Sequence, residues 1–233
     1  MQIPIVIYTH SDYFDVFKFN INSCIKLRIL ARDWLVTQFS DSTFLPDTVS
    51  MSGIQYHDNK SYGDRLLECL YNYKQELFLF IHEDFILYDV PNNDKLLEYY
   101  NIMEKNPQIS FIRLLKTNEI ADVKWGDTLY ITNNKFAVQA TLFRREWLEK
   151  FINSMPEDKR SIWDLEEYCE LSKIPYFGLY HYNGENKRGL VHYDSNVFPY
   201  TATAIVKGKW NSEYKDELMK LNPDYDFSKR GWT

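Results

Sequence analysis

The sequence has few cysteines and no long apolar run. Its three cysteines, Cys24, Cys69 and Cys169, are odd in number and far apart, and no two have the spacing of a metal-binding knuckle. We therefore expect buried free thiols in a reducing compartment, the cytoplasm, rather than a disulfide framework or a zinc ribbon. No stretch approaches the length of a transmembrane helix. The opening MQIPIVIYTH lacks the basic segment of a signal peptide and predicts a first strand instead.

Basic charge is also scarce. The 233 residues carry 27 Lys and Arg against 33 Asp and Glu, which gives a net charge of −6. A protein that grips duplex nucleic acid through many phosphates normally has a basic surplus, so we expect no such partner. Small phosphorylated substrates are compatible with this charge, because a few local cations or a metal ion can hold them.

Several catalytic motifs are missing. The chain has no GxGxxG, Walker A, HExxH, CxxC or GxSxG, which argues against dinucleotide oxidoreductases, P-loop enzymes, zincins and α/β-hydrolases. Aromatic residues, in contrast, make up 17% of the chain. Most should fill the core, but Tyr and Trp also suit sites that stack on bases or sugars. The abundance of Tyr, Asn, Lys and Ile favours an AT-rich viral or bacterial genome, and a viral source would make the compartment the host cytoplasm.

Strands and helices alternate in the first half, which predicts a mostly parallel sheet covered on both faces. The expected strands are Ile3–Tyr8, Trp34–Phe39, Val49–Tyr56, Leu77–Ile81 and Ile109–Leu115. The expected helices are Tyr13–Arg32, one capped by Asn59 or Ser61 and running through Tyr73, and one capped by Asn92 or Asn93 and ending near Lys105. The strand Leu77–Ile81 is apolar throughout, as expected for a strand buried on both faces.

The second half is expected to mix strands and helices. Asn133-Asn134 is a hairpin-type turn signal between two predicted strands, Leu129–Thr132 and Phe136–Phe143. The other expected elements are helices at Arg144–Ser154, Ile162–Ser172 and Asn211–Leu221, strands at Tyr176–Tyr182 and Leu190–Tyr193, and a loop at Asn183–Gly189. No internal repeat or long linker divides the chain, so we predict a single domain over residues 1–233.

The strongest chemical signal is His82-Glu83-Asp84, directly after the apolar strand. In open α/β sheets, ligands bind outside the carboxyl ends of the strands. Burying acidic groups at such a strand end is costly unless they are paired or hold a metal. Carboxylates that face a diphosphate need a divalent cation between them. The alternative is a strand that runs out into solvent with ordinary surface charges, and the triplet alone does not separate the two interpretations.

The segment SYGDRLLECLYNYKQELFLFIHEDF, residues 61–85, resembles the middle of a GT-A glycosyltransferase. That family has a helix whose start contains Gly and a basic residue, followed by a very apolar strand that ends in an acidic DxD-like motif. The resemblance implies a Rossmann-like three-layer α/β sandwich with a mostly parallel, mixed central sheet. It also implies a nucleotide-binding part at about 1–117 and an acceptor-side part at about 118–233.

The resemblance implies a metal site at the strand end. Asp84 matches the last Asp of the motif, Glu83 is the middle residue, and His82 stands where the family has its first Asp. His192 lies where many members have a third metal ligand, although a hydrogen-bonded strand histidine explains it equally well. We therefore expect Mn²⁺ or Mg²⁺ at Asp84, His82 and His192, with the change to His82 implying a weaker metal site or an enzyme that works without metal.

The resemblance also implies where a nucleotide-diphosphate sugar, most simply a UDP-sugar, would bind. The loop after the first strand would surround the base, an acid near the base would bind uracil or ribose, and the start of the following helix would close over the nucleotide. The corresponding residues are Thr9 and His10 in the loop, Asp41 as the acid, Gly63, Asp64 and Arg65 at the helix, and Glu83 beside the motif's last Asp.

An inverting transfer needs a carboxylate beside the acceptor hydroxyl to take its proton. Asp164 and Glu166 lie where inverting members of the family place this base, although an acid at a helix start also satisfies the helix dipole. The leaving diphosphate needs positive charge. Lys207 and Lys209, in VKGKW, would supply it unless they belong to a solvated loop.

The expected function is the transfer of a sugar from a nucleotide-diphosphate donor to a hydroxyl of a glycan or another acceptor. One alternative is a nucleotidyltransferase, which would use the same sheet and acidic site on a nucleoside triphosphate. Such enzymes usually have a Gly-rich basic loop after the first strand, and THSDYFD has neither Gly nor Lys. The other alternative is a non-catalytic carbohydrate-binding or interaction protein on a degenerate transferase scaffold.

Overall fold

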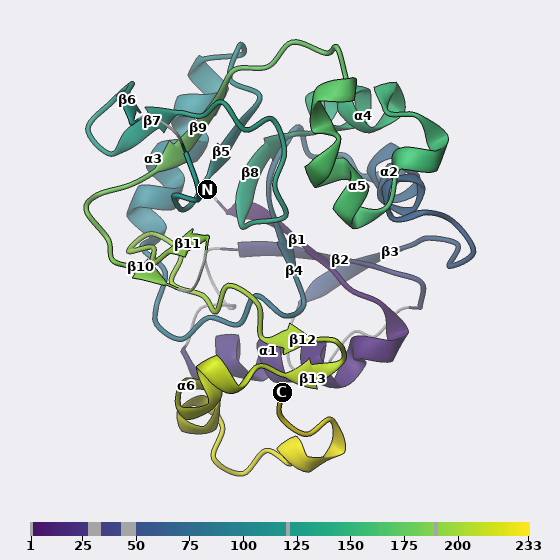
Figure 1. Ribbon diagram of the computed structural model, residues 1–233, viewed down its shortest axis with the longest axis vertical. Helices are drawn as coiled ribbons and strands as arrows, with labels where there is room; N and C mark the ends of the chain where they lie inside the picture. The colour runs from purple at the N-terminus through teal and green to yellow at the C-terminus, as the bar shows by residue number, and fades with distance from the viewer. Residues whose placement is uncertain (1, 28–33, 43–49, 120–121, 189–190) are drawn as a thin grey trace.

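The computed structural model describes residues 2–27, 34–42, 50–119, 122–188 and 191–233 (Figure 1). Its central feature is a nine-stranded sheet with the order β3-β2-β1-β4-β8-β5-β9-β7-β6. The strands are β1 Ile3–Tyr8, β2 Trp34–Ser40, β3 Met51–Gln55, β4 Leu77–His82, β5 Phe111–Arg113, β6 Val123–Lys124, β7 Leu129–Ile131, β8 Thr141–Arg144 and β9 Gly178–His181. Strands β3, β2, β1 and β4 are parallel, and β8 lies antiparallel between β4 and β5.

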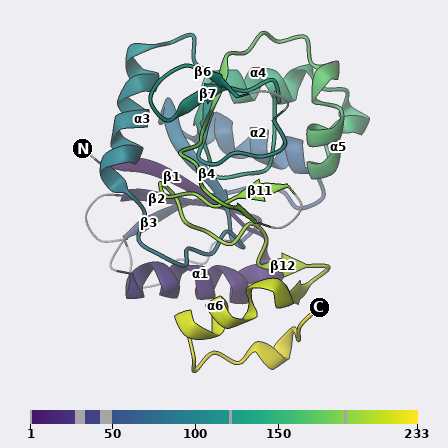
Figure 2. The same ribbon diagram turned by 60° about the vertical axis from the view of Figure 1, so that its left-hand side comes forward.

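Helices cover both faces of the sheet, as Figures 1 and 2 show. The bounds are α1 Phe14–Lys26, α2 Tyr62–Asn72, α3 Asn93–Lys105, α4 Arg145–Ser154, α5 Ile162–Glu167 and α6 Lys215–Leu221. Side chains of α1 and α3 pack with Ile5 and Leu79 in one core cluster. Those of α2, α4 and α5 pack with Val6 and Phe80 in another. Neighbouring residues of β1 and β4 thus point to opposite helix layers, which makes a three-layer sandwich.

The predicted strand at Leu77–Ile81 is confirmed as β4, whose side chains are all buried. Burying each Leu, Ile or Phe side chain contributes roughly 1.5–3 kcal/mol, so this strand is a main anchor of the core. Two predicted helix caps are also confirmed. The Ser61 hydroxyl accepts a hydrogen bond from the Asp64 N–H at the start of α2, and the Asn92 side chain accepts one from the Lys95 N–H at the start of α3.

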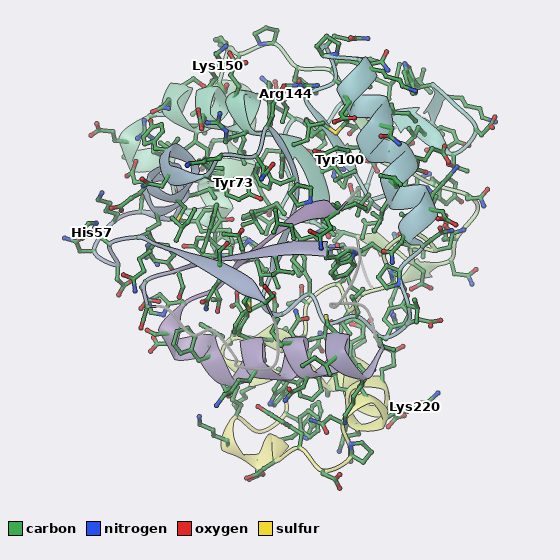
Figure 3. The ribbon with its side chains drawn as sticks, turned by 180° about the vertical axis from the view of Figure 1, so that it is seen from behind. His57, Tyr73, Tyr100, Arg144, Lys150 and Lys220 are labelled. Atoms are coloured by element: carbon green, nitrogen blue, oxygen red, sulfur yellow. The ribbon has the colours of Figure 1, made fainter. Side chains whose placement is uncertain are left out.

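Arg144 ties the two halves of the sheet together. Its guanidinium donates to the backbone oxygens of Met103 (2.8 Å) and Ile109 (3.3 Å) and pairs with Glu76 (2.6 Å). Figure 3, seen from behind, shows Arg144 between the end of α3 and the start of α4. These contacts link the end of β8 to the end of α3 and to the residues that precede β4 and β5.

The predicted hairpin across Asn133-Asn134 is wrong. Strand β7 pairs with β6 and β9, whereas β8 pairs with β4 and β5. The Asn134 side chain accepts a hydrogen bond from the Phe136 N–H, and Phe136 packs into the core beside α4. The turn signal is therefore real, but it starts an irregular segment that crosses to the middle of the sheet instead of returning beside β7.

Several other boundaries differ from prediction. The helix expected over Ile162–Ser172 ends at Glu167 and continues as a separate turn of 3-10 helix at Cys169–Leu171. Strand β5 is shorter than Ile109–Leu115, and part of the loop expected at Asn183–Gly189 forms β10, Lys187–Arg188. The predicted end of the first helix at Arg32, and the residues Val49, Gly189 and Leu190, lie outside the described residues.

The C-terminal segment packs on the outer side of α1. It contains the two-stranded hairpin of β12 (Ile205–Val206) and β13 (Lys209–Trp210), followed by α6. Trp210 is fully buried against Phe19 of α1, and Figures 1 and 2 show α6 beside this helix. The helix predicted in the tail is thereby confirmed. None of the helices in the described part of the chain is long and apolar enough to cross a membrane.

Candidate active site

A cavity of about 820 Å³ opens at the carboxyl ends of β1 and β4. Its walls come from these strand ends, the start of α2, the irregular segment before β8, helix α5 and the β12–β13 hairpin. Of the residues predicted to form the site, those that line it are His10, Arg65, His82, Glu83, Asp84, Glu166, His192 and Lys207. The structure thus brings most of the predicted groups, from six separate parts of the chain, to one cavity.

Glu83 and Asp84 lie in the chain directly after β4. The backbone here is held firmly: the Glu83 N–H donates to the Tyr8 oxygen, and the Asn20 side chain donates to the oxygens of Glu83 and Phe85. Burial raises the pKa of Asp84 to about 7. Burial and the Asp84 charge raise the pKa of Glu83 well above its ordinary value. Two adjacent desolvated carboxyl groups therefore face the cavity, and ionising both requires a compensating cation.

His82 stands in the wall as a neutral ring. It stacks between Tyr62 and Phe85, with centroids 5.7 and 5.5 Å away, and its Nε2 shares a 2.9 Å hydrogen bond with the Tyr62 hydroxyl. Burial lowers the pKa of His82 to about 3. Its Nε2 atom is thus already used within the protein.

His192 is likewise neutral and hydrogen-bonded. The side-chain amide of Gln139 donates to His192 Nε2, and Gln139 is itself held by the Tyr200 hydroxyl at 2.6 Å. Burial, and next the charge of Arg113, lower the pKa of His192 to about 4. Metal binding through Nε2 at either histidine would require an existing hydrogen bond to break.

The two candidate bases occupy different positions. Glu166 lines the cavity, one of its oxygens accepts from the Val138 N–H (2.5 Å), and burial raises its pKa. Asp164 is not among the lining residues: it bonds to the Ser161 hydroxyl (2.6 Å) at the start of α5 and lies 3.7 Å from Lys159. Asp164 therefore bonds within the N-terminal turn of α5. Glu166 instead lines the cavity and has one carboxylate oxygen available to a ligand.

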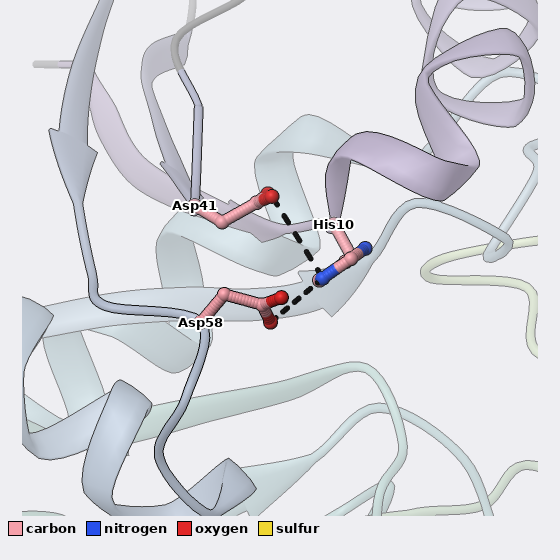
Figure 4. Close-up of side chains that lie close together, drawn as sticks. All are labelled: His10, Asp41 and Asp58. Atoms are coloured by element: carbon pink, nitrogen blue, oxygen red, sulfur yellow. Dashed lines mark hydrogen bonds and ion pairs between the residues drawn. The ribbon is translucent and has the colours of Figure 1, made fainter.

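At the other end of the cavity, His10 lies between two carboxylates. Its Nε2 is 2.8 Å from Asp58 and 3.7 Å from Asp41, as Figure 4 shows. These three groups have the spacing of a metal site. However, His10 Nδ1 accepts the Asp12 N–H (3.2 Å), which leaves the proton on Nε2, and Arg65 already lies 3.2 Å from Asp58. The set is therefore best described as a hydrogen-bonded network around an N–H donor.

The remaining predicted nucleotide-binding residues support this end from behind. Asp41 accepts hydrogen bonds from the Ser11 N–H and hydroxyl, and these outweigh burial and lower its pKa. Thr9 is fully buried. Its backbone N–H donates to the Phe39 backbone oxygen, and its backbone oxygen accepts a hydrogen bond from the Tyr56 hydroxyl. Both side chains shape the loop that carries His10, and neither lines the cavity.

At the start of α2, Gly63 and Asp64 fasten the helix rather than face the cavity. The Gly63 N–H donates to the Arg160 oxygen (2.8 Å), and Asp64 pairs with the Arg160 guanidinium (2.6 Å). In the C-terminal hairpin, Lys207 lines the cavity from a left-handed turn with φ of 50°, whereas Lys209 is exposed on β13 outside the lining.

Sequence reasoning missed several residues of the cavity. Tyr8, the last residue of β1, lines it and is 6% exposed, and its ring stacks on that of Tyr56. Its position at a strand end is a signal that could have identified it. Arg113 forms a buried 2.6 Å ion pair with Glu119 that holds Thr117 at the cavity edge. That pair joins the end of β5 to the loop that follows it, with the partners six residues apart in the sequence.

The fold resembles that of known GT-A glycosyltransferases. Residues 1–349 of S. aureus TarS match this chain with a TM-score of 0.51 and 12% identity, over 99% of this chain and 68% of that one. The same fragment in complex with UDP matches with a TM-score of 0.51 and 13% identity over the same shares. A UDP-glucose pyrophosphorylase complexed with UDP-glucose has a TM-score of 0.49 at 9% identity, over 78% and 90% of the two chains.

The similarity to TarS, at this low identity, concerns the fold. It confirms the predicted Rossmann-like, GT-A type of α/β sandwich. Comparison with protein-family models and with curated protein sequences gives no match.

Proposed function

We propose that this protein is a glycosyltransferase that moves a sugar from a nucleotide-diphosphate donor to an acceptor hydroxyl. The observation that carries this proposal is one cavity with two separate acidic centres. Glu83 and Asp84 lie at the end of β4, and Glu166 lies on α5. Metal-assisted release of a diphosphate needs the first kind of centre, and deprotonation of an acceptor needs the second.

The donor would lie between the ends of β1 and β4. TarS binds UDP on a similar fold, which supports a UDP-sugar here. The proposed nucleotide contacts are His10, with Asp41 and Thr9 shaping its loop, and Arg65, with Gly63 and Asp64 fixing its helix. The Tyr8 side chain, in the cavity wall, is a further group available to contact the donor.

Asp84, with help from Glu83, fits a divalent cation such as Mn²⁺ or Mg²⁺. Both are oxygen ligands of the kind these ions prefer, and burial raises the pKa of each, with the charge of Arg230 offsetting part of the rise at Glu83. Such an ion supplies positive charge to the leaving diphosphate. The proposal rests on the two carboxylates, because His82 and His192 are neutral and hydrogen-bonded through Nε2. Lys207 would add charge from the hairpin, with Lys209 outside the cavity.

Glu166 is the proposed general base. Burial raises the pKa of Glu166 toward neutral pH, and a general base works most effectively when its pKa lies near the working pH. In an inverting transfer, Glu166 takes the acceptor proton while the acceptor oxygen forms its bond to the anomeric carbon. The bond from that carbon to the diphosphate oxygen breaks, and the diphosphate leaves with the electron pair.

The test is release of UDP from UDP-glucose, UDP-galactose or UDP-N-acetylglucosamine with Mn²⁺ present. We expect release by the wild type, its loss in Asp84→Asn, and its retention in Asp89→Asn, which replaces an exposed acid outside the cavity. A nucleotidyltransferase would instead release pyrophosphate from UTP and a sugar 1-phosphate. A binding protein would show a UDP-dependent rise in Tm without turnover. Full activity of Asp84→Asn would contradict the site assignment.

A further inference from the structure

Trp163 stands out at the mouth of the cavity. Its side chain is 71% exposed, the largest fraction among the exposed large apolar residues of the described chain. It nevertheless lines the cavity, from helix α5. In the part of the chain that the structure describes, its ring has neither an aromatic nor a hydrogen-bond partner. A flat aromatic face is therefore presented to whatever enters the cavity.

The position of Trp163 relative to Glu166 is set by the helix. Residues three apart on a helix are neighbours on one face, so the indole lies beside the proposed base. Val138 lines the same cavity, and its N–H donates to the Glu166 carboxylate. This side of the cavity thus offers an aromatic face and apolar contacts around a single partly desolvated carboxyl group.

The charges distinguish this side from the donor side. The basic side chains among the described lining residues are Arg65, from α2, and Lys207, from the β12–β13 hairpin. Neither belongs to α5. An anionic ligand is therefore favoured at the donor side, whereas the face formed by Trp163 suits a neutral molecule.

We propose that Trp163 is the platform on which a neutral pyranose ring of the acceptor stacks, so that the acceptor is a glycan. This inference rests on the proposed transferase function. A pyranose has one face of C–H groups, which packs on an aromatic ring, and hydroxyls at its edge, one of which would meet Glu166. A simple lipid or peptide hydroxyl offers the base an oxygen but no such flat face for the indole.

The test uses protein labelled with 5-fluorotryptophan, whose ¹⁹F spectrum reports each of the 6 Trp residues separately. Trp163→Phe assigns the Trp163 signal. The probes are the methyl α- and β-pyranosides of glucose, galactose, mannose and N-acetylglucosamine, added with UDP and Mn²⁺. We expect at least one glycoside to shift the Trp163 signal in a saturable way, with the signal of Trp125, a partly exposed Trp outside the cavity, unchanged.

The second measurement compares affinities. Trp163→Ala should weaken binding of that glycoside roughly tenfold, which corresponds to about 1.4 kcal/mol, and Trp163→Phe should weaken it less. Trp125→Phe is the matched control. No saturable shift with any glycoside, or equal affinity in Trp163→Ala and wild type, would overturn the platform. So would a wild-type dimer that becomes a monomer in Trp163→Ala, because the indole would then contact a second copy.

The two proposals fail in different ways. A UDP-dependent rise in Tm reports the donor side independently of glycosides. If UDP binds and UDP-sugars turn over but Trp163 does not respond to glycosides, the platform is wrong and the transferase function stands. If glycosides bind at Trp163 but UDP and UDP-sugars do not bind, the platform stands as a carbohydrate site and the transferase function is wrong.

Discussion

In the wild type, ionisation of the buried Asp84 should lower the free energy of unfolding as pH rises. Replacing Asp84 with Asn should remove this loss. Burial raises the pKa of Asp84 to about 7 from an ordinary value of 3.8. Between these values the folded protein holds a proton that the unfolded chain has lost, so the free energy of unfolding falls as pH rises. At 1.36 kcal/mol per pKa unit, the full effect is about 4 kcal/mol if the ionised group stays dry, and smaller where water from the cavity reaches it.

The buried histidines act in the opposite direction. The pKa values of His82 and His192 are lowered to about 3 and about 4. Their contribution to stability is therefore lost as pH falls below about 6.5, where the unfolded chain takes up protons first. A pH profile of the wild type alone mixes these effects with that of Asp84. The difference between wild type and Asp84→Asn isolates the carboxyl group, because the histidines are common to both.

The assay is urea denaturation at pH 5 and pH 8 in EDTA, followed by circular dichroism. The free energy of unfolding of Asp84→Asn, taken relative to wild type, should be roughly 2–3 kcal/mol higher at pH 8 than at pH 5. Asp89→Asn, an exposed neighbour, should gain nothing. Repeating the comparison with Glu83→Gln in both proteins removes the other acid of the pair. Mn²⁺ at pH 8 should stabilise the wild type and not Asp84→Asn. A stability difference between wild type and Asp84→Asn that stays constant with pH would contradict the raised pKa of Asp84.

Three further predictions concern catalysis and packing. Glu166→Gln should lower kcat about 10²–10⁴-fold with the UDP-dependent Tm shift retained, while Glu167→Gln, an exposed control, keeps wild-type turnover. Arg113→Met should cost about 3–5 kcal/mol in urea denaturation by stranding buried Glu119, and the double replacement of both by Met should recover most of the loss. Gly178→Ala should lower stability by about 1–3 kcal/mol or more, because a Cβ there would lie 2.2 Å from the Phe111 ring. Thermal unfolding checks the last, and an unchanged Tm would contradict it.

Much of the fold could be predicted because its signals are local. The apolar run of β4 and the caps at Ser61 and Asn92 each depend on a few neighbouring residues. The partner of β8 could not be predicted in this way. A turn signal at Asn133-Asn134 indicates that the chain bends. Whether β8 then pairs with β7 or inserts between β4 and β5 depends on packing against distant helices.

The site shows the same division. The position of Glu83 and Asp84 at the cavity could be predicted because an acidic group after a buried strand is a local signal. The position of Glu166 was not separable from that of Asp164, because the choice depends on which face of α5 meets the cavity. Trp163 was missed for a related reason: exposure is a property of the folded surface, and a Trp in a helix is normally expected to be buried.

The most direct test of the proposed function is a crystal structure of the protein soaked with UDP and Mn²⁺, with the metal located by its anomalous scattering. We expect Mn²⁺ on Asp84, with Glu83 beside it, the diphosphate on the metal, and the uridine at the end of β1 near His10. Mn²⁺ bound instead among His10, Asp41 and Asp58, or UDP bound outside the cavity, would contradict the proposed site.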